Sequence, residues 1–446
     1  MTRNDLHNII TNNSKDGICI WWFNVDLDID WAQQKSSFFP RVDTSDKMSV
    51  WGMEQIMLML ASENDFVIMR HQPNELICDN IKKTGSKLPN ILTPSDGDIN
   101  QRSMSELILS DSKLIMVLRG IAKKSKTYLI PYAITEHEMK IAELIGAELI
   151  GPSYELASWV NSKITARNIS KELNFATTFG MECHSKEDLS VASDVIQNKY
   201  PNSMMVLKDE YGASGKGLFF IKEKRDLDLV IYRANKIENN HLKFNTILEK
   251  WYSVKENINY QLIISNDTYL LKNYLFNLSK QDVKNGVYKG SIFFKNNSKI
   301  YESYTYYAIL LGDYLYSKGY RGICNVDSII TDDDLIIPII EINGRFSLST
   351  YISCMSDIFC QNMSIASAYY DINSKIELSE LNNYINKYKY NLESKIGIFI
   401  YSFSIGIKCS RLFCLFIYPD MKNINKIELE FENMLENLNL KYKGMG

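Results

Sequence analysis

The 446-residue sequence contains no long apolar run and no apolar segment near its start. No stretch approaches the roughly 18 consecutive apolar residues of a membrane-spanning helix. The richest stretch, residues 412–418, has only the length of a strand. The polar first 17 residues lack the apolar core of a signal peptide. We therefore expect a cytoplasmic protein with no membrane partner.

Cysteine, histidine and positive charge are also too sparse or too scattered for several common kinds of site. The eight cysteines include no C-x-x-C pair, so neither a zinc site nor a disulfide framework is predicted. The five histidines form no cluster in the sequence. The formal net charge is −3, which argues against a nucleic-acid partner, because binding a phosphate backbone needs a large positive surface.

The length and the hydrophobic periodicity predict two or three domains that mix helices and strands. A chain of this length exceeds the size of one hydrophobic core. Residues 1–155 alternate candidate strands, such as 16–25 and 65–70, with helical patterns. This rhythm is typical of a parallel sheet covered by helices. No G-x-G-x-x-G follows any of these strands, so a dinucleotide site is not supported there.

After about residue 155 the pattern becomes α+β. Helices are expected over 155–173 and 305–318, and most of 246–307 reads as strands. The apolar runs 322–331 and 335–343 are expected to pair as antiparallel strands around the acidic turn Thr-Asp-Asp-Asp. Beyond residue 352 we expect one or two helices, two strands and a last helix over 424–440, with no evident role.

A lysine followed by a glycine-rich turn is the first feature with a chemical implication. Lys208 ends a candidate strand, and the segment 211–221, YGASGKGLFFI, leads into the next one. Glycine lets backbone N–H groups approach phosphate oxygens closely, and the small Ser214 does not obstruct that approach. The Walker pattern is absent. A flexible hairpin with an exposed lysine is the alternative interpretation.

Two acids seven residues apart enclose an aromatic segment. Glu249 and Glu256 flank Trp251 and Tyr252. A strand that ends in an acid, a linker whose backbone can read a purine edge, and a second acid for ribose hydroxyls would together clamp a nucleotide. An amphipathic strand with solvated acids is the alternative interpretation.

An acid, an amide and a base alternate at the end of a buried strand. Side chains two apart on a strand share a face, so Glu341, Asn343 and Arg345 should point the same way. Asp327 lies on the strand expected to pair with theirs. Carboxylate and amide oxygens suit Mg²⁺, and a guanidinium can hold a phosphoryl or carboxylate group. A structural salt-bridge network is the alternative, although a buried acid pair without a cation is costly.

In this order, the three features resemble the ATP-grasp superfamily over roughly residues 155–352. The resemblance implies α/β plus α+β structure, with ATP held between two subdomains and a carboxylate activated as an acyl phosphate. It implies a Rossmann-like pre-ATP-grasp domain over 1–155 and an N-terminal ATP-grasp subdomain over 156–246. A C-terminal subdomain over 247–446 would hold the magnesium site and a C-terminal extension. The implied cofactors are ATP and Mg²⁺, with Mn²⁺ as an alternative ion.

Carried over by position, the resemblance implies a set of site residues. The expected nucleotide-binding residues are Lys163, Lys208, Gly212, Ser214, Gly215, Gly217, Glu249, Lys250, Trp251, Tyr252 and Glu256. The expected metal ligands are Asp327, Glu341 and Asn343. Arg345 is expected to stabilise the acyl phosphate, and Lys289 lies where family members place a loop near the acceptor carboxylate. Gly344 stands where many relatives have proline, which leaves the assignment within the superfamily open.

The N-terminal region and the segment 129–163 narrow the resemblance. They are similar to ATP-grasp ligases of natural-product pathways, both peptide ligases of the pheganomycin type and carrier-protein ligases of the butirosin type. The implied activity is a carboxylate–amine ligase that joins small-molecule substrates through an amide. Two alternatives stay open: thioester formation on an acyl carrier protein, and nucleotide binding without catalysis. A homodimer is also left open.

Overall fold

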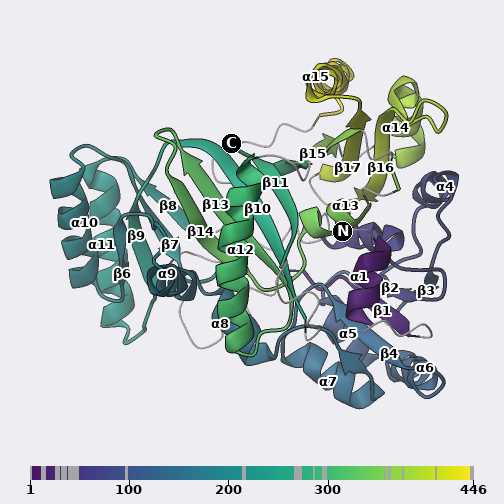
Figure 1. The fold of residues 1–446 in the computed structure, drawn as a ribbon, viewed down its shortest axis with the longest axis horizontal. Helices are drawn as coiled ribbons and strands as arrows, with labels where there is room; N and C mark the ends of the chain where they lie inside the picture. Colours follow the sequence, from purple (N-terminus) through teal and green to yellow (C-terminus); the bar gives the residue numbers. More distant parts are fainter. Residues whose placement is uncertain are drawn as a thin grey trace.

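A computed structural model of the chain describes residues 3–11, 17–25, 31, 38, 50–95, 99–212, 217–265, 274–284, 287–293, 299–355, 358–359, 363–373, 376–406 and 409–441. Of the expected site residues, Ser214 and Gly215 lie outside this described part. Three sheets carry the named strands, and they occupy successive parts of the chain (Figure 1).

The first sheet is parallel and has the order β3-β2-β1-β4-β5. Its strands are β1 (Ile18–Trp22), β2 (Phe66–Ile68), β3 (Asn90–Leu92), β4 (Thr127–Pro131) and β5 (Glu148–Leu149). The accompanying helices are α1 (Arg3–Ile10), the 3-10 helix η2 (Gly52–Met59), α4 (Glu75–Lys83), α5 (Met104–Ser110), α6 (Ser112–Ala122) and α7 (Glu136–Ile145). The central strands are apolar throughout because two separate hydrophobic clusters pack on them. The predicted parallel sheet is confirmed.

The second sheet is antiparallel, with the order β6-β9-β7-β8. Its strands are β6 (Gly180–Cys183), β7 (Met205–Asp209), β8 (Leu218–Ile221) and β9 (Thr246–Lys250). Helices α10 (Lys186–Lys199) and α11 (Lys224–Asn239) pack together against it (Figure 1). The single helix expected over 155–173 is two helices, α8 (Tyr154–Asn161) and α9 (Lys163–Glu172). They separate at Ser162, which is extended and whose side chain caps α9.

The third sheet has eight strands in the order β14-β13-β10-β11-β12-β15-β17-β16. Its strands are β10 (Val254–Ile264), β11 (Leu275–Lys284), β12 (Val287–Phe293), β13 (Gly322–Thr331), β14 (Ile336–Asn343), β15 (Ser364–Asn373), β16 (Gly397–Ser404) and β17 (Cys409–Tyr418). Helix α12 (Lys299–Ser317) packs on one face of β10 and its neighbours (Figure 1). It begins six residues before the expected start at 305, because the tyrosine-rich segment 301–307 continues the helix instead of a strand.

The C-terminal region contains a strand that the sequence did not predict. β15 is rich in serine and alanine, residue types with weak strand propensity. It pairs with β12 and with β17, so the last strands continue the same sheet as β13 and β14. At this junction a side chain on Gly290 of β12 would meet the Ser367 carbonyl oxygen of β15. The remaining helices are α13 (Leu348–Met355), α14 (Leu378–Tyr384), the 3-10 helix η3 (Asn386–Tyr388) and α15 (Met421–Asn437), the last of which begins earlier than expected.

The sheets span residues 18–149, 180–250 and 254–418. The predicted boundary after 155 falls within α8, and the one after 246 falls within β9. The division into these domains remains a prediction. No described helix is both long and apolar enough to cross a membrane. The seven cysteines of the described part are free thiols.

Candidate nucleotide and metal site

Two carboxylates face each other on neighbouring strands. Asp327 of β13 lies directly opposite Glu341 of β14, which confirms the predicted pairing of these strands. The Asn343 amide lies beside both, with Nδ2 3.2 Å from Glu341 Oε1 and 3.5 Å from Asp327 Oδ2. The three residues expected to bind a metal are therefore brought together at one point of the sheet.

The pKa values of the two acids are shifted in opposite directions. Burial, and then the neighbouring Glu341 carboxylate, hold the pKa of Asp327 well above its usual range. Burial also opposes ionisation of Glu341, but the Lys163 ammonium at 3.1 Å outweighs it and lowers the pKa of Glu341. A divalent cation between the carboxylates would remove their repulsion, and the oxygen donors fit Mg²⁺.

Two amides fix the orientation of Asp327. Asn259 of β10 donates to Asp327 Oδ1 at 2.8 Å, and Gln281 of β11 donates to the same oxygen at 3.1 Å. Asn259 in turn accepts hydrogen bonds from Gln261 and from Ser349 at the start of α13. The amides therefore occupy Oδ1, and Oδ2 is the oxygen on the side of Asn343. Sequence reasoning missed both amides, although alternating polar residues in an otherwise apolar strand are a usable signal.

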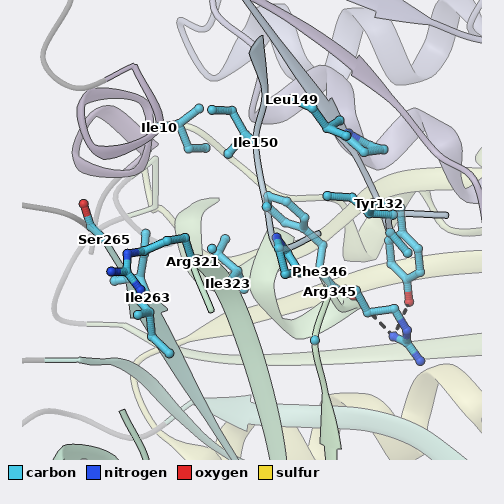
Figure 2. A pocket seen from close by; sticks show the side chains of 18 of the residues that line it. Ile10, Tyr132, Leu149, Ile150, Ile263, Ser265, Arg321, Ile323, Arg345 and Phe346 are labelled. Atoms are coloured by element: carbon cyan, nitrogen blue, oxygen red, sulfur yellow. Dashed lines mark hydrogen bonds between the residues drawn. The ribbon is translucent and has the colours of Figure 1, made fainter. Parts of the chain in front are cut away.

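Arg345 joins the end of β14 to the N-terminal sheet. Its Nη1 donates to the Tyr132 hydroxyl at 2.8 Å, and Cζ lies 5.2 Å from the centre of that ring. Tyr132 directly follows β4, and a cavity of about 180 Å³ opens beside these residues, with Phe346 and Ile323 in its wall (Figure 2). Ligands of parallel α/β sheets bind at the carboxyl ends of the strands. Arg345 also helps to lower the pKa of Glu341.

Lys163 connects the acid pair with the glycine turn. Its ammonium lies 3.1 Å from Glu341 Oε2 and donates to the Gly212 carbonyl at 2.7 Å. Gly217, at the other end of the turn, has a φ of +91°, a conformation that side chains rarely adopt. Lys163 therefore links Gly212, the first described glycine of the expected phosphate loop, to Glu341 of β14.

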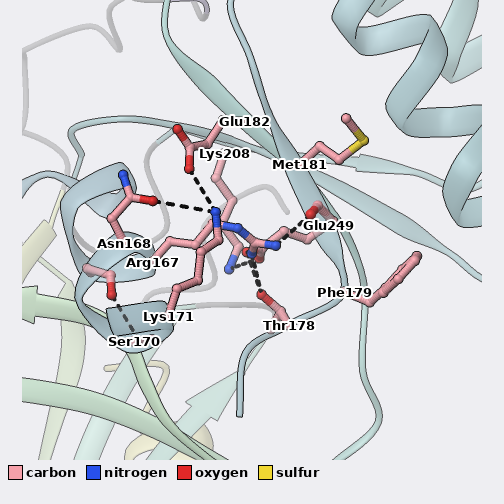
Figure 3. A network of polar contacts seen from close by, with 12 residues as sticks. Arg167, Asn168, Ser170, Lys171, Thr178, Phe179, Met181, Glu182, Lys208 and Glu249 are labelled. Atoms are coloured by element: carbon pink, nitrogen blue, oxygen red, sulfur yellow. Dashed lines mark hydrogen bonds and ion pairs between the residues drawn. The ribbon is translucent and has the colours of Figure 1, made fainter. Parts of the chain in front are cut away.

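Lys208 is held in a buried network of charges. Its ammonium is 2.7 Å from Glu249, whose other oxygen is 3.0 Å from Arg167 and accepts from Thr178 (Figure 3). Burial raises the pKa of Glu249, but Lys208, Thr178 and Arg167 outweigh that effect and lower it. Sequence reasoning missed Arg167, although it lies one helical turn after Lys163 and shares a face of α9 with it.

The segment expected to read the adenine is fixed at the end of β9. The Trp251 N–H donates to the Met204 carbonyl at 2.8 Å. The Tyr252 hydroxyl accepts from the Phe179 N–H at 3.2 Å. The Lys250 ammonium lies 4.4 Å from the centre of the Tyr252 ring. These contacts attach the segment to the residues that directly precede β6 and β7.

No family model matches the chain. A curated relative, the [butirosin acyl-carrier protein]–L-glutamate ligase of Niallia circulans, is 28% identical over 338 residues, which are 75% of this chain and 73% of the relative. The N5-carboxyaminoimidazole synthetase of Staphylococcus aureus with ADP aligns at a TM-score of 0.54 and 13% identity, over 95% of this chain and 99% of that one. The biotin carboxylase domain of the Hydrogenobacter thermophilus 2-oxoglutarate carboxylase, with MgADP, aligns at 0.50 and 12% identity, over 90% and 86%.

These solved structures have the ATP-grasp fold, and the curated relative is a ligase. The chain therefore has the ATP-grasp fold. The predicted fold class is thereby confirmed, and the predicted resemblance to butirosin-type ligases agrees with the similarity to the curated relative. The roles of individual residues remain predictions, because the comparisons do not test them.

Two of the expected site residues lie apart from the acid pair. Glu256, near the start of β10, pairs with Lys280 of β11 at 3.2 Å. Its charge acts on Tyr304 of α12, so it lies toward the helix-covered side of the sheet. Lys289 of β12 lies 3.5 Å from the Tyr369 hydroxyl of β15. The structure thus places Lys289 with the C-terminal strands, whose role the sequence left open.

Proposed function

We propose that the ligase binds ATP and Mg²⁺, with Mn²⁺ as an alternative ion, and activates the carboxylate of an amino acid or peptide as an acyl phosphate. An amine then attacks the acyl carbonyl, phosphate leaves, and an amide forms. The observation that carries this proposal is the convergence of Asp327, Glu341 and Asn343 with Lys163 beside the glycine turn. It combines metal ligands and a phosphate-neutralising cation in one place.

Each group has a role that its geometry supports. Asp327, Glu341 and Asn343 would hold the ion, which supplies positive charge to the β- and γ-phosphates when bound. Lys163 and Lys208 would neutralise the charge that develops as the γ-phosphoryl group transfers. Arg345, which donates a hydrogen bond to the Tyr132 hydroxyl, would stabilise the acyl phosphate. No covalent enzyme nucleophile is needed, and the buried Cys324 packs in the core of the sheet.

One observation favours a thiol, instead of an amine, as the acceptor. The curated relative is named as a ligase of L-glutamate and an acyl-carrier protein, so a carrier thiol could replace the amine and give a thioester. The third alternative, nucleotide binding without catalysis, finds less support. A protein that only binds the nucleotide does not need the acids and lysines that are present here.

The test is product analysis with a panel of amino acids, with and without hydroxylamine as a promiscuous acceptor. The expected result is a hydroxamate together with stoichiometric ADP and phosphate. AMP and pyrophosphate would overturn the mechanism. ADP that forms only with a pantetheinylated carrier, whose added mass hydroxylamine removes, would establish the thioester reaction. Glu341→Gln is the control, since loss of the ion's ligand should abolish all products.

A further inference from the structure

Two cationic side chains lie close to one tyrosine ring on the C-terminal strands of the eight-stranded sheet. The Lys289 ammonium of β12 lies 5.1 Å from the centre of the Tyr369 ring of β15. The Arg411 guanidinium of β17 lies 4.8 Å from the same centre. The Tyr369 hydroxyl donates to the Tyr288 carbonyl at 2.9 Å, which fixes the ring.

The charges of this cluster do not cancel. Asp371 of β15 accepts from Arg411 Nε at 2.9 Å and offsets one of the two positive charges. The Lys289 ammonium has only the Tyr369 hydroxyl and ring as described partners. The excess charge lies on Lys289, whose side chain is neither buried nor fully exposed, so solvent can reach it. Excess positive charge of this kind attracts an anion.

The register places this cluster on the same face of the sheet as the acid pair. Gln281 of β11, which donates to Asp327, lies opposite Ser291 of β12, and Ser291 lies opposite Ser367 of β15. Cross-strand partners and residues two apart on one strand share a face. The polar surface beside Asp327 therefore continues along the sheet as far as Ser367.

The same rule shows that the cations lie on this face of the sheet. Tyr369 and Asp371 follow Ser367 at intervals of two, and Asp371 lies directly opposite Arg411 of β17. Lys289 contacts Tyr369 and so belongs to this face as well. Three strand spacings separate β13 from β12, roughly 14 Å. The cations therefore stand on the metal side of the sheet, some distance from the reacting centre.

We propose that Lys289 and Arg411 bind an anionic group, a carboxylate or a phosphate, at the far end of an extended substrate. This inference rests on the proposed function and adds the class of substrate to it. The anion has two sources: an acidic side chain of a peptide whose own carboxylate is activated, or the phosphate of a phosphopantetheine arm that presents the acceptor thiol. Free amino acids are too short to reach the cations and the metal site together.

Binding calorimetry with two matched pairs of probes tests the proposal. The first pair is L-glutamyl-L-alanyl-L-alanine and L-glutaminyl-L-alanyl-L-alanine, whose backbone extends over roughly 10 Å before the first side chain is added. The second pair is phosphopantetheine and pantetheine. The full chain with MgADP is titrated as wild type, Lys289→Gln, Arg411→Gln and the control Lys426→Gln. Lys426 is an exposed cation of α15, so its replacement makes the same change of charge away from the face.

The expected result is that the anionic member of one pair binds the wild type roughly tenfold or more tightly than its neutral partner. Lys289→Gln and Arg411→Gln remove this difference, and Lys426→Gln keeps it. The pair that shows the difference identifies the source of the anion. Equal binding within both pairs, or a preference that survives both substitutions, overturns the proposal. If Arg411→Gln unfolds, Lys289→Gln decides alone.

The outcome is separable from that of the proposed function. ADP release in the hydroxylamine assay reports the ligase chemistry, whereas the binding difference needs no turnover. ADP release without any preference for the anionic probes would refute the anion site and leave the ligase chemistry intact. A charge-dependent binding preference without ADP release would refute the ligase chemistry and leave the anion site intact.

Discussion

Replacing Glu249 by glutamine should destabilise the protein strongly. The Glu249 side chain is 6% exposed and lies between Lys208, which is 10% exposed, and Arg167, which is 8% exposed. Without the carboxylate charge, two cations stay buried beside a neutral amide. Removing one partner from a buried ion pair costs about 3–5 kcal/mol. We expect the free energy of unfolding of the Glu249→Gln variant to fall by about this amount at pH 7.

The effect has a definite pH dependence. Burial alone would raise the pKa of Glu249, but Lys208, Thr178 and Arg167 lower it below the ordinary value. A carboxyl whose pKa is lower in the folded state stabilises that state above its unfolded pKa, about 4.3. The contribution is lost as the pH falls through the lowered, folded pKa. The difference in stability between wild type and variant should therefore be full at neutral pH and shrink in acid.

Urea unfolding at a series of pH values, followed by tryptophan fluorescence, measures this difference. Glu182→Gln is the matched control, because Glu182 pairs with Lys171 at 3.4 Å on the surface of the same region. Such exposed pairs contribute about 1 kcal/mol or less. The reasoning is refuted if Glu249→Gln and Glu182→Gln unfold at the same urea concentration at pH 7.

Three further substitutions test the site itself. Lys208→Ala should weaken ATP binding by about 1.5–3 kcal/mol, since it removes a charge-assisted phosphate contact; an unchanged calorimetric affinity would contradict this role. Glu341→Gln should keep the far-UV circular dichroism and lose ADP production, because an amide is a poorer magnesium ligand; ADP formation near the wild-type rate would make the strand merely structural. Asn259→Ala should raise the Mg²⁺ concentration at half-maximal rate by roughly 10–100-fold, because Asp327 loses an orienting donor; an unaltered Mg²⁺ requirement would show that Gln281 suffices.

The parts of the site that sequence could predict are those set by local pattern. The alternation at 341–345 and the acidic turn before it determine which side chains share a face and which strands pair. The structure adds the register, in which Asp327 lies opposite Glu341. The helix break at Ser162 and the strand at 364–373 were missed. In both places the local preference is weak, and packing against distant segments decides the structure.

The networks around the site depend on contacts between distant segments. Lys208 meets Glu249 because β7 and β9 pair, and Arg167 reaches the same carboxylate from α9. The register of β10 and β11 beside β13 likewise brings Asn259 and Gln281 to Asp327. No spacing in the sequence predicts these side-chain contacts, because each one depends on how two elements of secondary structure pack against each other.

The junction of β12 and β15 limits how this enzyme can diversify. A side chain on Gly290 would collide with the Ser367 carbonyl, and the strands on either side of the junction form one hydrogen-bonded ladder. Cutting the chain before residue 363 would bare the edge of β12, which is the kind of surface that recruits other strands. The C-terminal segment is thus no interchangeable module.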